Sequence, residues 1–223
     1  MRLFAAVHPP DDALDHLEGA LTSLRGRPAG RPGDVAAGVR WTPPHDRHVT
    51  VAFFGEVPAG YLDELTASLD ELVAGQQQFE ASLAGAGLFD RRTLWVGCAG
   101  GGWTSLMSAA REAGAALGRT LEERSRPHLT IARARPRLGG DRRRGAGERD
   151  DRSPGRRRED TRRAAAGSGV PDPADLVHAL ALYRGPTWTV REVQLVSSRL
   201  GVGPGGSPRH EVVHVSPLAP VAG

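Results

Sequence analysis

The chain has 223 residues, 39% of them apolar and 25% charged, which is the composition of a globular protein with enough chain to bury a core. All 29 basic residues are arginine, so the isoelectric point of about 9.9 accompanies a formal net charge of only +3. All-arginine usage with much alanine and glycine is typical of a GC-rich coding sequence, so the arginine count alone does not indicate nucleic-acid binding. No apolar run approaches the ~18 residues of a membrane span. The apolar stretch near the start of the sequence is shorter than a signal peptide requires. The single cysteine, Cys98, excludes an internal disulfide framework and a cysteine-based zinc site, so we expect a reduced, cytoplasmic protein.

Segments of strand type and of helix type alternate along the chain. Leucines at helical spacing and flanking turn residues predict helices over 11–26, 61–73, 104–117 and 173–183. Strand patterns cover 2–7, 39–41, 48–55, 79–89, 93–98, 128–134, 188–198 and 210–216. Several of these strands follow one another directly, which favours antiparallel pairing and an α+β fold.

An arginine-rich stretch interrupts this pattern. Between Pro136 and Arg163 there are eleven arginines and six acids, a charge of +5, so the rest of the chain sums to −2. Leu138 is the only large aliphatic residue there, and a segment without apolar side chains cannot offset the entropy of ordering. We predict a disordered insertion over 136–170, a solvated surface loop; electrostatic contact with RNA phosphates is the alternative.

Two predicted strands share one motif. His48-Val49-Thr50-Val51 and His128-Leu129-Thr130-Ile131 each place an imidazole and a hydroxyl on one face of a strand and two aliphatic side chains on the other. The copies lie 80 residues apart, each near a preceding arginine (Arg47 and Arg126), which indicates an internal duplication. The looser copy His214-Val215-Ser216 lacks the basic flank and a following helix, and we do not count it.

With its flanks, this motif pair resembles a known family. The segments that carry the resemblance are MRLFAAV, RWTPPHDRHVTVAFFGEV, LWVG, RPHLTIAR and EVQLVSSRLGVGPGGSPRHEVV. They are similar to the two-histidine (2H) phosphoesterase superfamily, and within it to the RNA 2′,3′-cyclic phosphodiesterases, also called the 2′-5′ RNA ligase (LigT/ThpR) family. The chain departs from the family at His210 and Ser197, where tyrosine is usual, and in its arginine-rich insertion.

The resemblance implies a fold and a reaction. The fold would be a single bilobal, pseudo-duplicated α+β domain over 1–223, with antiparallel sheets lining a central cleft and helices outside. The reaction would be metal-independent hydrolysis of RNA 2′,3′-cyclic phosphodiester ends to 2′-phosphomonoesters, with His48 as proton donor and His128 as proton acceptor. Histidine suits both roles because its ordinary pKa of about 6.5 allows one neutral and one protonated copy near pH 7.

Four further residues are candidate phosphate ligands. Thr50 and Thr130 can donate hydrogen bonds to the non-bridging oxygens. Arg126 shares strand parity with His128, which places it on the cleft face if the strand extends back past Pro127. Arg133 matches the family pattern but has the opposite parity, so a regular strand directs it away from the phosphate. Phe4 and Trp41 are predicted core residues rather than platforms for stacking nucleobases.

The motifs contain no acid, and no phosphate-binding loop occurs in the sequence, so we expect no metal and no cofactor. The expected substrates are RNA ends or small nucleotides that carry a 2′,3′-cyclic phosphate, handled by a monomer without membrane contact. One alternative stays within the superfamily: 2′-5′ RNA ligation, or hydrolysis of another cyclic or 2′-5′-linked nucleotide. The other is a non-catalytic RNA-binding module that uses the arginine-rich insertion.

Overall fold

The computed structural model describes residues 1–25, 39–115, 117–118, 121, 126–134, 173–203 and 206–221. The predicted insertion over 136–170 lies outside the described residues, and its disorder therefore stays a prediction.

Most predicted elements are present in the described part of the chain. The strands are β1 (Arg2–Val7), β2 (Val39–Trp41), β3 (Val49–Glu56), β4 (Phe79–Phe89), β5 (Thr93–Ala99), β6 (His128–Ala134), β7 (Arg184–Val190), β8 (Glu192–Arg199) and β9 (Arg209–Pro217). The helices are α1 (Asp11–Arg25), α2 (Leu62–Ala74), α3 (Trp103–Ala115) and α5 (Pro173–Leu180), with short 3-10 turns η1 (Pro44–Asp46) and η2 (Ala59–Tyr61).

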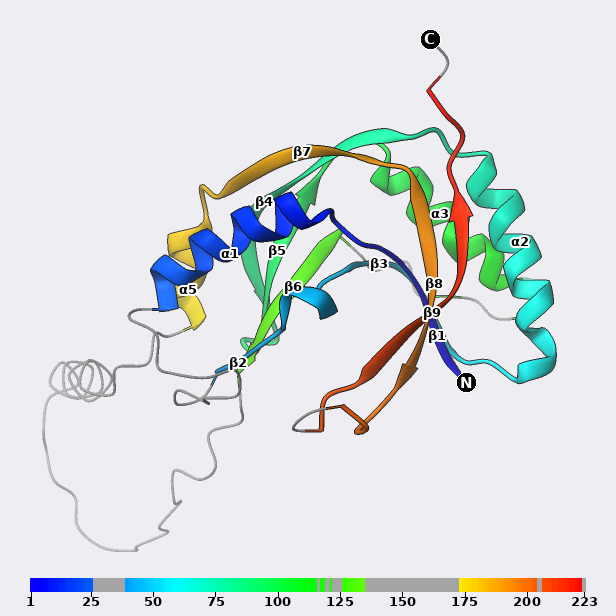
Figure 1. Cartoon of the computed structure of the whole chain (residues 1–223), viewed down its shortest axis with the longest axis horizontal. Helices are drawn as coiled ribbons and strands as arrows, with labels where there is room; N and C mark the ends of the chain where they lie inside the picture. The colour runs from blue at the N-terminus through cyan, green and yellow to red at the C-terminus, as the bar shows by residue number, and fades with distance from the viewer. Residues whose placement is uncertain are drawn as a thin grey trace, which may run out of the picture.

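The strand predicted over 188–198 is instead two strands that belong to different parts of the sheet. β7 pairs with β4 and β8 pairs with β1, and the chain turns between them at Arg191. Both pieces have strand-type sequence, so the pattern alone did not reveal the corner. Figure 1 shows the consequence: β7 arches over the molecule from one side to the other before β8 descends.

The nine strands of the described residues belong to one curled sheet in the order β7-β4-β5-β6-β3-β1-β8-β9, with β2 added on β6. Every strand pair in this sheet is antiparallel, which confirms the predicted α+β class. The two lobes expected from the duplication are two halves of this sheet. They meet where β3 lies beside β6, through the single register pair Val49 and Leu129.

The helices divide between the two halves of the sheet. α1 packs on β7 and α5 on β4, whereas α2 and α3 pack on each other and on β9 and β3 respectively. Figure 1 shows these two helix pairs on opposite sides of the molecule. α2 buries Leu65, Leu69 and Val73, which recur every four residues and so form one apolar stripe.

The aliphatic residues of the two motifs lie in the same core. Val49, Val51, Leu129 and Ile131 are at most 1% exposed. Since a shift of one residue would carry each of these side chains to the other face of the sheet, their burial strongly specifies the register of β3 and β6. The polar motif residues are thereby held on the face that the core does not occupy.

Candidate active site

A cleft of about 500 Å³ lies on the polar face of β3 and β6. Both motif histidines and both motif threonines line it, so the structure brings together the four residues that the sequence singled out. The other lining residues come from β1, β2 and its following loop, the end of β6, and the segment around β9: Arg2, Arg40, Trp41, Thr42, Pro43, Asp46, Arg133, Leu200, Ser207, Pro208 and His210.

The two motifs meet in antiparallel register. Val49 pairs with Leu129, and because the strands run in opposite directions, this register sets His48 across from Thr130 and Thr50 across from His128. The two histidines are therefore diagonal neighbours, a relationship that on a regular ladder separates backbone positions by about 7–8 Å. Each half of the sheet contributes one imidazole and one hydroxyl to the same patch.

Each imidazole is held by the same backbone contact. Nδ1 of His48 lies 2.9 Å from the carbonyl oxygen of Asp46, and Nδ1 of His128 lies 2.7 Å from that of Arg126. A carbonyl oxygen can only accept, so Nδ1 is the donor in both rings. In the neutral form this leaves the lone pair on Nε2, which is the nitrogen that can exchange a proton with a ligand.

Aromatic side chains pack against both rings. Phe4 stacks on His48 with ring centroids 4.8 Å apart, and Phe89 meets His128 edge-on at 4.9 Å. Phe4 is buried, but it belongs to a small cluster with Ala6 and Val196 that is separate from the main core. Phe4 is thus buried, as predicted for a core residue. It lies outside the main core, however, and packs against the His48 ring.

Trp95 also packs against His128, with ring centroids 6.0 Å apart. Its indole lies over the neighbouring strand at Gly87, where a Cβ atom would overlap the ring. Trp95 can therefore adopt this position only because residue 87 is a glycine. Trp41, the other predicted core aromatic, is only partly buried and lines the cleft.

Two further histidines surround His48. The His8 ring lies 5.7 Å from that of His48 and the His210 ring 5.3 Å from it. Burial, then the charge of His8, lowers the pKa of His48 to about 4, against the opposing hydrogen bond to Asp46. Burial also lowers the pKa values of His8 and His210. His48 is consequently neutral at pH 7.

The basic residues before the two motifs have different environments. Arg47 is 1% exposed, and it donates to Glu18 of α1 at 2.6 Å and to the carbonyl oxygen of Thr42 at 3.1 Å. Arg47 thus connects the start of β3 to α1. Arg126 is exposed and does not line the cleft, because β6 begins only at His128 and strand parity does not extend back to it.

Arg133 lies in the cleft, contrary to the parity argument. Relative to β5, Trp95 pairs with Thr130 and Leu94 with Ala132, so Ile131 is an extra residue in β6. This bulge reverses the alternation, and both Ile131 and Ala132 are buried while Arg133 turns to the same side as Thr130. Among the described residues, Arg133 forms no ion pair with an acid.

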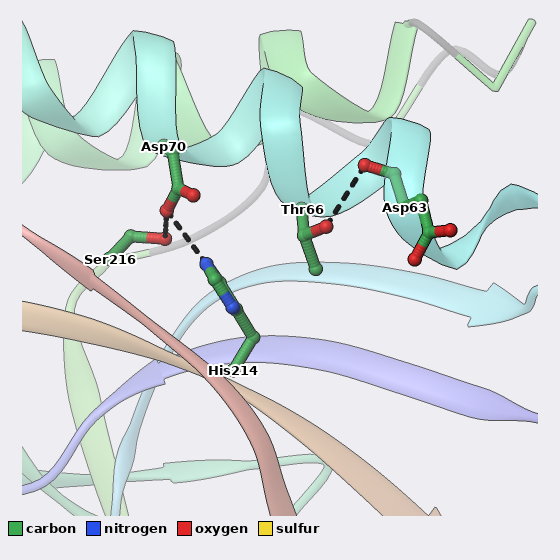
Figure 2. A network of polar contacts seen from close by, with 5 residues as sticks. All are labelled: Asp63, Thr66, Asp70, His214 and Ser216. Carbon is green, nitrogen blue, oxygen red and sulfur yellow. Dashed lines mark hydrogen bonds and ion pairs between the residues drawn. The ribbon is translucent and has the colours of Figure 1, made fainter.

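The excluded third motif faces the opposite way. A bulge at Val213 reverses the alternation of β9, so His210 lies in the cleft whereas His214 and Ser216 face α2. There, Asp70 accepts from Nε2 of His214 at 2.8 Å and from the Ser216 hydroxyl at 2.6 Å (Figure 2). These two hydrogen bonds to the carboxylate connect β9 to α2.

Sequence reasoning missed several residues of the site. His8 and Phe89 carry no motif, and Arg40, Trp95 and His210 lie in the segments that resemble the family without a predicted role in the site. The sheet brings His8, His210, Phe89 and Trp95 beside the motif histidines and places Arg40 in the cleft. Among the described residues, no group of three or more His, Cys, Asp or Glu side chains is arranged to hold a metal ion. Nor does any described helix have the length and apolarity needed to cross a membrane.

The chain is similar in sequence to proteins that share one name. The chain is 29% identical over 140 residues to an RNA 2′,3′-cyclic phosphodiesterase of Archaeoglobus fulgidus, a match covering 60% of this chain and 73% of that protein. It is 35% identical over 99 residues to a protein of the same name from Geobacillus stearothermophilus, 42% of this chain and 32% of the relative. The chain therefore spans about a third of the length of the Geobacillus protein.

Solved structures show the same fold. A protein of Thermus thermophilus superposes with a TM-score of 0.66 at 24% identity, with both chains covered completely. LigT of E. coli in its apo form gives a TM-score of 0.62 at 20% identity, covering 98% of this chain and 97% of LigT. The family model described as the 2′-5′ RNA ligase superfamily matches residues 7–142, more than half of the chain and including both motifs. With these motifs in one cleft on this fold, the chain belongs to the 2′-5′ RNA ligase superfamily.

Proposed function

We propose that the protein hydrolyses 2′,3′-cyclic phosphate at RNA ends to 2′-phosphomonoesters, without a metal ion, by general acid–base catalysis between His48 and His128. The observation that carries this proposal is the register of the two motifs, which sets two imidazoles with fixed Nδ1 donors diagonally across one cleft. Relatives named RNA 2′,3′-cyclic phosphodiesterase support the choice of substrate.

The step is a displacement at phosphorus. A water oxygen forms a bond to phosphorus while one neutral imidazole takes the water proton at Nε2. The bond from phosphorus to O3′ breaks, and the other imidazole, protonated, gives its Nε2 proton to O3′. Thr50 and Thr130 donate hydrogen bonds to the non-bridging oxygens, and Arg133 offsets negative charge on them.

We assign His48 as the proton donor and His128 as the acceptor, as in the family. In this order His48 has to be protonated in the complex, although burial and the charge of His8 lower its pKa to about 4. A bound phosphodiester anion beside the ring raises that pKa, since an opposite charge favours the protonated form. The low pKa of His48 by itself favours the reverse order. A substrate whose leaving group needs no proton donor distinguishes the two assignments.

That substrate is a cyclic phosphorothiolate with sulfur in place of O3′. A thiolate leaves without a proton more readily than an alkoxide because the thiol is the stronger acid. If His48 is the donor, His48→Ala regains turnover on the sulfur substrate and His128→Ala does not. The opposite pattern assigns donation to His128.

A second activity is favoured by the description of the family itself. The 2′-5′ RNA ligase superfamily is named for joining, and the same histidine pair can open the cyclic phosphate with an alcohol in place of water. In the joining reaction a ribose 5′-hydroxyl attacks phosphorus and gives its proton to the neutral imidazole, while the P–O3′ bond breaks and O3′ takes the proton of the other imidazole.

The decisive assay uses an RNA oligonucleotide ending in 2′,3′-cyclic phosphate, with and without EDTA and with and without an acceptor bearing a 5′-hydroxyl. We expect a 2′-phosphomonoester as the product, in unchanged yield with EDTA. A 3′-phosphomonoester, a joined product only, or loss of turnover in EDTA would each overturn part of the proposal. RNA binding without turnover, unaffected by His48→Ala and His128→Ala, would identify a binding module instead.

A further inference from the structure

The pairing of the two motif strands is short for the task of holding two histidines in register. β3 pairs with β1 along the whole of β1, whereas in the described structure its pairing with β6 consists of Val49 and Leu129. One pair of residues fixes a distance but leaves the two strands able to pivot about it. A second connection between β3 and β6 would keep His48 and His128 at a constant separation.

Arg47, the residue before the first motif, supplies such a connection. Its buried guanidinium donates from Nε to the carbonyl oxygen of Thr42 at 3.1 Å. The backbone N–H of Thr42 in turn donates to the carbonyl oxygen of Ile131 on β6 at 2.9 Å. Thr42 directly follows β2, where Trp41 pairs with Ala132, so it extends the pairing of β2 with β6 by one residue. These contacts join the start of the first motif to the last residue of the second.

The segment that Arg47 closes also carries the carbonyl that orients His48. It contains Pro43 and Pro44, whose rings restrict their φ angles. The turn η1 ends where the backbone N–H of Arg47 donates to the Pro44 carbonyl oxygen at 3.0 Å. Asp46, whose carbonyl oxygen accepts from Nδ1 of His48 at 2.9 Å, belongs to this turn. The guanidinium therefore holds in place the backbone on which the imidazole depends.

Glu18 of α1 fixes the direction of the guanidinium. Its carboxylate lies 2.6 Å from Nη2 of Arg47, whose side chain has 0% of its surface exposed, against 29% for Glu18. Because the donors of a guanidinium lie in one rigid plane, this contact also directs Nε toward Thr42. Replacing a buried ion pair by apolar side chains of similar volume often costs no stability, so stability alone does not account for the pair.

We propose that Arg47 is a positioning residue, which sets the orientation of His48 and its separation from His128 by linking the segment before β3 to β6. This rests on the function proposed above and deepens it, because it names a residue outside the cleft on which proton transfer by His48 depends. Arg47 is buried and does not line the cleft, so it acts through Thr42 and through the Asp46 carbonyl.

The test separates position from stability with the double variant Glu18→Leu/Arg47→Met, which exchanges the ion pair for apolar side chains of similar volume. We expect its melting temperature to stay within about 5 °C of wild type. Its kcat on an RNA 2′,3′-cyclic end should fall about tenfold with KM changed by less than about twofold, because a displaced imidazole affects the chemical step.

Two further variants complete the comparison. Arg47→Lys keeps the charge beside Glu18 but lacks the planar fork that reaches Thr42, so it should lose about as much kcat, and it provides the same test should the double variant unfold. Asp70→Ala removes hydrogen bonds between α2 and β9 on the other half of the sheet. It is the matched control and leaves kcat unchanged.

A second readout needs no turnover. Nδ1 of His48 and of His128 each donates to a backbone carbonyl oxygen, so each Nδ1–H should give a slowly exchanging proton signal in NMR spectra. In Arg47→Lys and in the double variant, the His48 proton should exchange with water about tenfold faster because its carbonyl partner is less firmly held. The His128 proton, bonded to the Arg126 carbonyl, should exchange as in wild type. This measurement needs no substrate, so failure of the positioning role and failure of the proposed function are distinguishable.

Three results would overturn the positioning role. An unchanged exchange rate of the His48 proton in both Arg47 variants would show that Arg47 does not orient the ring, whatever the turnover. Wild-type kcat in both variants would show that the pairing of β3 with β6 holds the histidines unaided. An equal fall in kcat in Asp70→Ala, or a His128 proton that changes as much as that of His48, would show general loosening of the fold.

Discussion

The Phe4 ring lies 4.8 Å from the His48 ring at an interplanar angle of 29°, so the two rings are stacked. Nδ1 of His48 is tied to the Asp46 carbonyl at 2.9 Å, and together these contacts define both the plane and the rotation of the imidazole. We expect Phe4→Leu to loosen this arrangement, with a loss of stability of about 1 kcal/mol because the volume changes little. Turnover should fall about tenfold with KM nearly unchanged, since a misplaced proton carrier affects the chemical step.

The pH profile distinguishes positioning from general destabilisation in Phe4→Leu. Less burial of His48 raises its pKa, so the acidic limb of kcat/KM moves to higher pH. Leu3→Ala, a truncation of the neighbouring buried residue on the core side of β1, serves as the control and should lower stability without moving the limb. The same shift in both variants would contradict the role of Phe4.

Stability should depend on the protonation of His48. Its pKa is about 4 in the folded chain against 6.5 for the ordinary side chain, so between these pH values the unfolded chain binds a proton that the folded chain does not. The free energy of unfolding therefore falls as the pH drops from about 6.5 towards 4, and His48 contributes about 2 kcal/mol of this loss at about pH 5. Urea unfolding near neutral pH and near pH 5 measures it.

His48→Asn removes this titration and should flatten that part of the pH dependence. The pKa values of His8 and His210 are lowered as well, so a remaining slope in His48→Asn is expected. An equal slope in wild type and His48→Asn would show that His48 is exposed to water rather than buried among other imidazoles.

The hydrogen bonds between Asp70 and β9 should affect the stability of the fold and not its activity. Asp70 accepts hydrogen bonds from His214 and Ser216, which lie on the side of β9 that faces α2. We expect Asp70→Ala to lower the free energy of unfolding by about 1 kcal/mol and to leave turnover unchanged. Adding His214→Ala should cost little more, because both changes remove the same contact. A fall in turnover in either variant would contradict a purely structural role.

The two motif strands could be predicted from the sequence because their buried side chains alternate with polar ones. Val49, Val51, Leu129 and Ile131 had to face one core, and this placed the histidines and threonines together on the opposite face. The antiparallel α+β class followed from strands that succeed one another without a long connection, and it is confirmed.

What the sequence did not predict depends on single extra residues and on distant strands. The bulge at Ile131 turns Arg133 into the cleft, and the bulge at Val213 places His210 and His214 on opposite faces of β9. The sequences of β6 and β9 show no sign of either bulge. His8 reaches His48 only because β1 lies between β3 and β8 in the sheet. Contacts of this kind depend on the order of strands, which no local pattern encodes.

Single-turnover hydrolysis of an RNA 2′,3′-cyclic end by His48→Ala, His128→Ala and the double variant tests most directly whether both imidazoles act on one phosphorus. Each single change should slow the reaction by ~10² or more, and the double variant should be far less impaired than the product of the two effects. His214→Ala, a histidine tied to α2, should react at the wild-type rate. Near wild-type turnover in either single variant, or effects that multiply fully in the double variant, would contradict a shared reaction centre.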